Sequence, residues 1–195
     1  MRNVQAAGKA VLIGCWVIYG VVFLWNAIKI QARRKADPQL ETGRKSAPAA
    51  KYGMLLEALG FLCAWLPRTP GDPVWQSLQI AALVLAPLSL LLGWLAIREL
   101  GIQWRIQAVV TQTHRLITTG PYAFVRHPVY TSLLGMLLAT GFVIADWKGI
   151  FAAVVLYVCG TEIRIAAEEK LLADRFGADF AIYRANVPAY IPLVR

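Results

Sequence analysis

The stretch LQIAALVLAPLSLLLGWLAI occupies residues 78–97 and contains no charged side chain over 20 residues. A helix of this length rises about 30 Å, which matches the hydrocarbon thickness of a bilayer. Lipid offers no hydrogen-bond partners to the backbone, so a segment that crosses it must be helical. Pro87 lies inside the stretch, and its missing N–H predicts a kink. These residues therefore predict an integral membrane protein.

Further apolar segments lie on both sides of this stretch, and Pro67 closes one of them. The whole chain is 58% hydrophobic and 16% charged, whereas soluble domains are roughly 45–50% apolar and about 25% charged. We predict an all-α polytopic membrane protein, formed by a single domain over residues 1–195. It has about five transmembrane helices, which we expect at residues 10–30, 52–66, 78–97, 130–145 and 150–165.

The last two expected spans are joined by the short polar sequence Asp-Trp-Lys-Gly at residues 146–149. So short a connection predicts a helical hairpin. The helical pattern of the fifth span does not stop at its end, but continues toward Phe176 with charged residues on one face. We therefore expect a C-terminal helical segment that leaves the membrane and becomes amphipathic.

Lys and Arg are distributed unequally between the expected connections. If there are five spans, sixteen of these residues lie on one side, in segments 29–51, 98–126 and 164–195, and four lie on the other. Basic residues favour the cytoplasmic side, so we expect the N-terminus outside and the C-terminus in the cytoplasm. The net charge of +9 is explained in this way, and we expect no nucleic-acid partner. The basic segment 33–50 is interpreted as a flexible loop that rests against anionic lipid headgroups.

Both histidines lie in one polar, aromatic segment, HRLITTGPYAFVRHPVY, at residues 114–130. Gly120-Pro121 is typical of a turn. Pro128 suits the first turn of the following helix, where its missing N–H costs nothing. His127 then stands at the start of that helix, beside unpaired backbone N–H groups and the positive end of the helix dipole. Such a position can bind a carboxylate or a ribose oxygen.

A simpler interpretation is that Tyr122 and His127 only anchor the loop at the membrane interface. Two histidines, two arginines and two tyrosines within 17 residues favour a functional site instead. The spacing from His114 to His127 does not resemble a pair of metal ligands on one helix face, so we expect no metal site.

A second group of charged residues follows the fifth expected span: Arg164, Glu168 and Glu169. Arg164 and Glu168 are four residues apart and share a helix face. They could form an ordinary ion pair at the interface, worth a few tenths of a kcal/mol. They could equally face a pocket, where the carboxylate binds hydroxyl or amino groups and the arginine holds an anionic acceptor by two hydrogen bonds.

Together these two groups resemble the isoprenylcysteine carboxyl methyltransferase family. The similar part covers about residues 107–192, close to half of the chain. It contains the motif Gly-x-Tyr-x-x-x-Arg-His-Pro-x-Tyr, then Arg-Ile-Ala-Ala-Glu-Glu-Lys-Leu-Leu, then FGADFAIYRANVPAYIP. The order of these three motifs makes a chance match unlikely.

The resemblance implies a methyltransferase that uses S-adenosyl-L-methionine and binds it on the cytoplasmic side without a Rossmann domain. Residues 104–130 and 164–195 would form the cofactor-binding part, with the C-terminal segment folded over the cofactor. The family's substrate-side arginine corresponds to Arg164, the expected catalytic residue. Its cofactor contacts correspond to Gln107, His114, Arg115, Leu116, Ile117, Tyr122, His127, Pro128, Val129, Tyr130 and Glu168.

The implied acceptor is the carboxylate of a lipophilic, prenylcysteine-like compound that reaches the site sideways from the bilayer, among membrane lipids. In a prokaryote the protein would lie in the plasma membrane. Three other interpretations stay open: a phospholipid or amine N-methyltransferase, an NADPH-dependent membrane reductase related to sterol reductases, and a membrane protein without catalytic activity.

Overall fold

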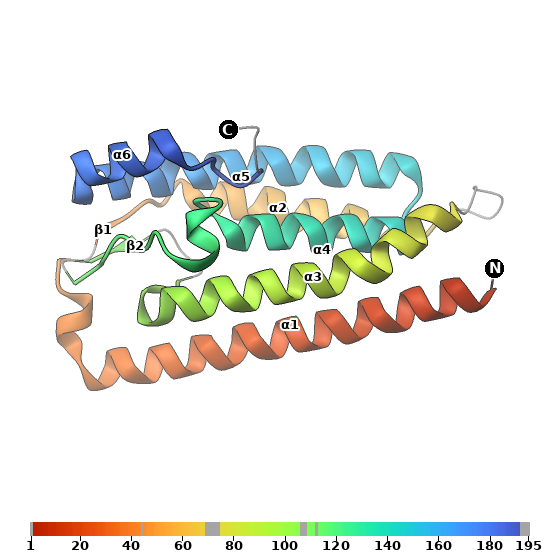
Figure 1. Cartoon of the computed structure of the whole chain (residues 1–195), viewed down its shortest axis with the longest axis horizontal. Helices are drawn as coiled ribbons and strands as arrows, with labels where there is room; N and C mark the ends of the chain where they lie inside the picture. Colours follow the sequence, from red (N-terminus) through yellow and green to blue (C-terminus); the bar gives the residue numbers. More distant parts are fainter. Residues whose placement is uncertain (1, 44, 69–74, 106–108, 112, 192–195) are drawn as a thin grey trace.

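The protein is an antiparallel bundle of long helices with small elements gathered at one end (Figure 1). The computed structural model describes residues 2–43, 45–68, 75–105, 109–111 and 113–191. In chain order the elements are α1 (Arg2–Ala36), η1 (Pro38–Glu41), β1 (Lys45–Ser46), α2 (Ala50–Trp65), α3 (Gln76–Leu100), η2 (Gly101–Gln103), β2 (Val109–Val110), η3 (Gly120–Ala123), α4 (Pro128–Ile144), α5 (Trp147–Phe176) and α6 (Ala178–Asn186).

The five expected spans lie on helices α1 to α5, apart from Leu66 and Ala145, which each directly follow the end of a helix. Among the described residues, three helices are long and apolar enough to cross a membrane: Gln5–Ala36, Gln76–Gln103 and Trp147–Phe176. Helix α4 is apolar but has 17 residues, and α2 has 16. A fully spanning helix needs about 20 residues. The number of five spans therefore stays a prediction, whereas the all-α class is confirmed.

The hairpin between α4 and α5 forms as expected. Helix α4 ends at Ile144 and α5 begins at Trp147, with Asp146 as its N-cap. The Asp146 carboxylate accepts a hydrogen bond from the Gly149 N–H at 2.7 Å, which pairs one of the free donors in the first turn. Helix α5 then runs without a break to Phe176, as the continuing pattern predicted.

Helices α2 and α5 approach one another more closely than side chains would permit. A Cβ atom added at Gly53 or at Gly160 would lie under 3.0 Å from backbone atoms of the other helix. Gly60 makes the same kind of approach to the Ala153 carbonyl group. Small residues at such positions are the usual way for helices to pack in membranes. The close approach brings one face of α2 against the charged end of α5.

Helices α1, α3 and α4 share a polar contact inside their apolar interface. Tyr19 and Ser132 are joined by a hydrogen bond of 3.0 Å between their hydroxyl groups. Ser132 also donates to the Ser89 carbonyl oxygen at 2.6 Å. Interhelical hydrogen bonds of this kind are worth about 0.6 kcal/mol on average in membrane proteins.

The basic segment 33–50, expected to be a flexible loop, is partly ordered in the structure. Helix α1 extends to Ala36, η1 follows, and β1 pairs with β2, with Lys45 opposite Val110. The Glu41 carboxylate accepts two hydrogen bonds from Arg105, at 2.7 and 3.1 Å. The ordering comes from partners more than sixty residues away, which local composition does not reveal. As a result η1, β1, β2, η3 and α6 lie together at one end of the bundle (Figure 1).

At the opposite end, Arg68 closes the C-terminus of α4. Its guanidinium donates to the carbonyl oxygens of Phe142 and Ala145, both at 2.7 Å. These carbonyls lie at the negative end of the helix dipole. We expect Arg68→Ala to lower the free energy of unfolding by about 1–3 kcal/mol, measured by thermal unfolding in detergent. Lys148→Ala, at an exposed position of the same end, is the matched control. Equal effects of the two substitutions would contradict the capping role.

Candidate functional site at one end of the bundle

The loop between β2 and α4 has the local structure that its motif predicts. Gly120 has φ +58°, a conformation that favours glycine, and opens the short helix η3. Pro128 begins α4, and His127 is the residue that precedes the first turn. Both turn and helix start lie where the motif predicted them. The loop thus presents Tyr122 and His127 at fixed positions next to α5.

The C-terminal segment holds this loop from the other side. The backbone N–H groups of Arg126 and His127 donate to the carbonyl oxygens of Pro188 and Ala189, both at 2.8 Å. The Tyr183 hydroxyl on α6 donates to the Tyr122 carbonyl oxygen at 2.6 Å. The segment that follows α5 is therefore part of the same unit as the loop.

Two adjacent carboxylates of α5 connect the helix to the loop. Arg126 binds Glu169 through Nε at 2.9 Å and Nη2 at 2.8 Å. His127 faces Glu169 through Nε2 at 3.3 Å and Glu168 through Nδ1 at 3.6 Å. The Tyr130 hydroxyl also donates to Glu168. Residues about forty positions apart in the sequence are thereby joined.

The position of His127 between two carboxylates determines its charge. Burial by itself would lower its pKa, but hydrogen bonds and charges from Glu168 and Glu169 outweigh burial and raise the pKa above its ordinary value. Each ring nitrogen faces one carboxylate, and both nitrogens can donate only in the protonated ring. The two carboxylates therefore stabilise the protonated form of His127 relative to an exposed histidine.

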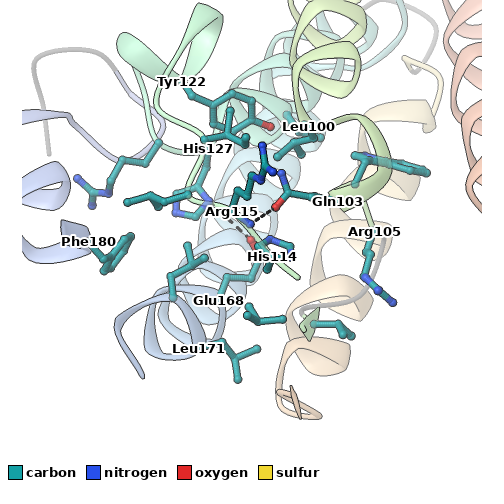
Figure 2. A pocket seen from close by; sticks show the side chains of 18 of the residues that line it. Leu100, Gln103, Arg105, His114, Arg115, Tyr122, His127, Glu168, Leu171 and Phe180 are labelled. Carbon is teal, nitrogen blue, oxygen red and sulfur yellow. Dashed lines mark hydrogen bonds and ion pairs between the residues drawn. The ribbon is translucent and has the colours of Figure 1, made fainter. Parts of the chain in front are cut away.

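These elements surround a cleft of about 950 Å³, measured with the solvent at its mouth. Figure 2 shows the side chains of Gln103, His127 and Glu168 meeting there from three parts of the chain. The Arg115 N–H donates to the Gln103 side chain across the same space.

Ten of the twelve site residues that the sequence predicted line the cleft, namely His114, Arg115, Leu116, Ile117, Tyr122, His127, Val129, Tyr130, Arg164 and Glu168. Pro128 is buried at the start of α4 and does not line it. Gln107 lies outside the described residues. The loop and the acidic part of α5 therefore converge as predicted, while the role of each side chain stays a prediction.

Other lining residues were not anticipated. Leu171 and Leu172 come from α5, Phe180 and Tyr183 from α6, and Gln103 from η2. The helical pattern after Arg164 placed the two leucines on one face of α5, which was the available signal. Gln103 had no comparable signal, because a single glutamine after an apolar span is common.

Arg164 makes an ion pair that the sequence did not predict. Its Nη1 lies 2.7 Å from the carboxylate of Glu57 on α2, whereas its Nη2 lies 3.8 Å from Glu168. The guanidinium also stacks over the Tyr130 ring, 4.9 Å from the centroid. The signal for Glu57 was a single carboxylate within an apolar segment, which in a membrane protein marks a functional candidate with a partner to be found.

Comparison with known proteins places this arrangement in a family. Residues 79–174, which contain the loop and most of α5, match the isoprenylcysteine carboxyl methyltransferase (ICMT) family. This match supports a member of the ICMT family. Glu57 and α6 lie outside the matched residues.

Relatives of the chain have names that denote methyltransferases. It is 35% identical over 82 residues to protein-S-isoprenylcysteine O-methyltransferase of Schizosaccharomyces pombe, which covers 42% of this chain and 34% of the relative. It is 34% identical over 82 residues to protein-S-isoprenylcysteine O-methyltransferase B of Arabidopsis thaliana. That match covers 42% of this chain and 41% of the relative. It is 29% identical over 156 residues to methanethiol S-methyltransferase 2 of Bradyrhizobium diazoefficiens. That match covers 72% of this chain and 58% of the relative.

The matches thus span between about a third and three fifths of the relatives' own lengths.

Within the cleft, His114 differs from His127 in the direction of its pKa shift. Burial and the positive charges of Arg105, Arg175 and Arg34 lower its pKa from 6.5 to about 4. His114 is therefore neutral at pH 7, with arginines on several sides. In this part of the cleft the arginines attract anions, while the His114 imidazole itself is uncharged.

The low pKa of His114 predicts a pH-dependent stability. Between pH 6.5 and about 4 the unfolded chain binds the proton and the folded chain does not, so this contribution to stability is complete above pH 6.5 and is lost as the pH falls. We expect His114→Asn to reduce the fall in thermal midpoint between pH 7.5 and pH 4.5, measured in detergent. Parallel curves for the variant and the wild type would contradict the assignment.

Proposed function

We propose that this protein transfers the methyl group of S-adenosyl-L-methionine to the carboxylate of a lipophilic acceptor, such as a prenylcysteine-like compound. The observation that carries the proposal is the convergence of the His114–Tyr130 loop and Glu168 on one cleft at an end of the helix bundle. The family match and the names of the relatives support methyl transfer.

The groups that line the cleft fit the cofactor. Glu168 offers a carboxylate to ribose hydroxyls or to an ammonium group, and its side chain is 24% exposed. Leu116, Ile117 and Val129 offer apolar surface to an adenine ring. Arg115 and the neutral His114 offer donors to a carboxylate. When bound, S-adenosyl-L-methionine supplies an activated methyl group on a positively charged sulfur.

The residues of the chain then have to align the acceptor and exclude water. A carboxylate acceptor is already ionised at pH 7, so no general base is needed. Arg164 would hold it by charge-assisted hydrogen bonds, and Tyr130 and His127 would keep the cofactor carboxylate Glu168 in place. Because opposite charges are neutralised during transfer, a site of low dielectric constant beside the lipid favours the reaction.

The proposal includes the topology. With five spans, α1 to α5 alternate in direction and the site elements share the end that carries sixteen of the twenty Lys and Arg residues. That end would be cytoplasmic, with the N-terminus outside. In a prokaryote this is the plasma membrane. A lipophilic acceptor would reach the cleft sideways from the bilayer.

A second candidate is methylation of a small thiol. The match to methanethiol S-methyltransferase 2 covers 72% of the chain, more than the matches to the two O-methyltransferases. The ion pair of Arg164 with Glu57 also balances a charge that would otherwise attract an anion. A thiol must lose its proton to react, so its methylation would accelerate with pH, whereas a carboxylate acceptor would react at a constant rate above pH 6.

Incubation of the purified protein with cofactor labelled in the methyl group tests both candidates. The acceptors are a prenylcysteine analogue, a small thiol, an amine phospholipid and total lipid extract. Label in base-labile ester supports carboxyl methylation, label in a thioether supports the thiol, and label in the lipid amine refutes both. Thermal stabilisation by NADPH instead of S-adenosyl-L-methionine would refute a methyltransferase altogether.

A further inference from the structure

Glu57 is a buried carboxylate on α2 that binds the guanidinium of Arg164. It is 5% exposed, accepts a hydrogen bond from Arg164 Nη1 at 2.7 Å, and accepts another from the Thr161 hydroxyl at 3.1 Å. Among the described residues it does not line the cleft. It therefore contacts a residue that lines the cleft without lining the cleft itself.

The glycine contacts of α2 and α5 bring these two side chains together. A Cβ at Gly53 would lie 2.6 Å from Cγ of Arg164, and a Cβ at Gly160 would lie 2.9 Å from the backbone N of Glu57. The stem of Arg164 thus passes directly over Gly53. From there the guanidinium reaches Glu57, one turn further along α2.

Among the described residues, two carboxylates lie within 4 Å of the Arg164 guanidinium, at clearly different distances. Glu57 is at 2.7 Å and Glu168 at 3.8 Å. Without Glu57, the buried guanidinium would lack its near counter-charge and would turn toward Glu168. That would occupy the carboxylate that the proposed function assigns to the cofactor.

We propose that Glu57 is a positioning residue, which fixes Arg164 at the acceptor side of the cleft and keeps it away from Glu168. The inference rests on the proposed function for the identity of the ligands. It predicts that replacing Glu57, which touches neither ligand, impairs the binding of both. Acceptor binding suffers because Arg164 is displaced, and cofactor binding suffers because Arg164 then occupies Glu168.

Cofactor binding tests this without any need for turnover. By calorimetry with S-adenosyl-L-methionine, we expect Glu57→Ala to weaken binding about fivefold or more. We expect the double variant Glu57→Ala with Arg164→Ala to bind as tightly as Arg164→Ala alone, because no guanidinium is left to pair with Glu168. Weak binding that persists in the double variant, or normal binding by Glu57→Ala, would overturn the proposal.

Kinetics provide the second measurement. At saturating cofactor, Glu57→Ala is expected to raise KM for the accepted substrate about tenfold, while Glu57→Gln, which keeps a hydrogen-bond acceptor for Arg164, recovers a large part of the loss. Ser132→Ala removes a buried interhelical hydrogen bond elsewhere and is the matched control: its thermal midpoint falls but its KM does not. An equal rise of KM in Ser132→Ala and Glu57→Ala would reduce Glu57 to a structural residue and overturn the proposal.

The two proposals fail in different ways. If the wild type methylates no acceptor but binds the cofactor, and the double variant restores binding, the proposed acceptor is wrong and the positioning role stands. If the wild type methylates an acceptor and all Glu57 variants bind and react normally, the proposed function stands and the positioning role is wrong.

Discussion

Replacement of Arg164 by alanine is expected to lower the turnover number for methyl transfer by about 100-fold or more, with little change in cofactor affinity. The guanidinium lines the cleft, held by Glu57 and stacked on Tyr130. Losing one preorganised charged donor at a reacting centre commonly costs about 10²–10³ in rate. The measurement is the initial rate at saturating cofactor and acceptor, together with the Kd for S-adenosyl-L-methionine by calorimetry.

Stability has to be controlled in this experiment, because Arg164→Ala leaves Glu57 buried without its counter-charge. Breaking a buried ion pair from one side costs about 3–5 kcal/mol. Arg164→Ala combined with Glu57→Gln removes that charge and should unfold at a higher temperature than Arg164→Ala alone, while staying inactive. Arg164→Lys keeps the charge without the planar fork and should give an intermediate rate. A collapse of cofactor affinity with normal turnover at saturating cofactor would show that Arg164 serves the cofactor instead.

The helices were predictable because their information is local. A run of apolar residues, such as 78–97, predicts a helix whatever its neighbours are, and the structure extends it only to Gln76–Leu100. Pro128 marks a helix start by a rule that needs no tertiary contact. The helical continuation to Phe176 is also a periodic pattern within one segment.

The ion pairs inside the site were harder to predict from the sequence, because they join segments that are distant along the chain. Glu57 and Arg164 are 107 positions apart, and Arg126 and Glu169 are 43 apart. The sequence indicated that Arg126 and Glu169 belong to the two converging regions, but not that they bind each other. Glu57 lies in a helix without any motif, so only the glycine contacts of α2 and α5 reveal its partner.

The ion pairs also change the meaning of the motif Arg-x-x-x-Glu on α5. Spacing alone suggests that Arg164 and Glu168 neutralise one another, because they are four residues apart. In the structure each is bound more closely elsewhere, Arg164 to Glu57 and Glu168 to Tyr130. Arg164 and Glu168 are therefore each held by a nearer partner than one another.

Replacement of Glu168 by alanine is the corresponding test of the cofactor half of the cleft. We expect it to weaken S-adenosyl-L-methionine binding at least about tenfold, since a charge-assisted hydrogen bond contributes roughly 1.5–3 kcal/mol. The measurement is calorimetry on folded protein in detergent. Glu162→Ala, on the same helix but not lining the cleft in the described residues, is the control and should bind normally.

Glu168→Gln then separates the two contacts that this carboxylate could make. A ribose hydroxyl donates to an amide oxygen nearly as well as to a carboxylate, so the Gln variant would keep most of the affinity. An ammonium group requires the negative charge, so the Gln variant would bind as weakly as the Ala variant. Unchanged affinity in Glu168→Ala would remove Glu168 from the cofactor site, and with it the reason for Glu57 to hold Arg164 away.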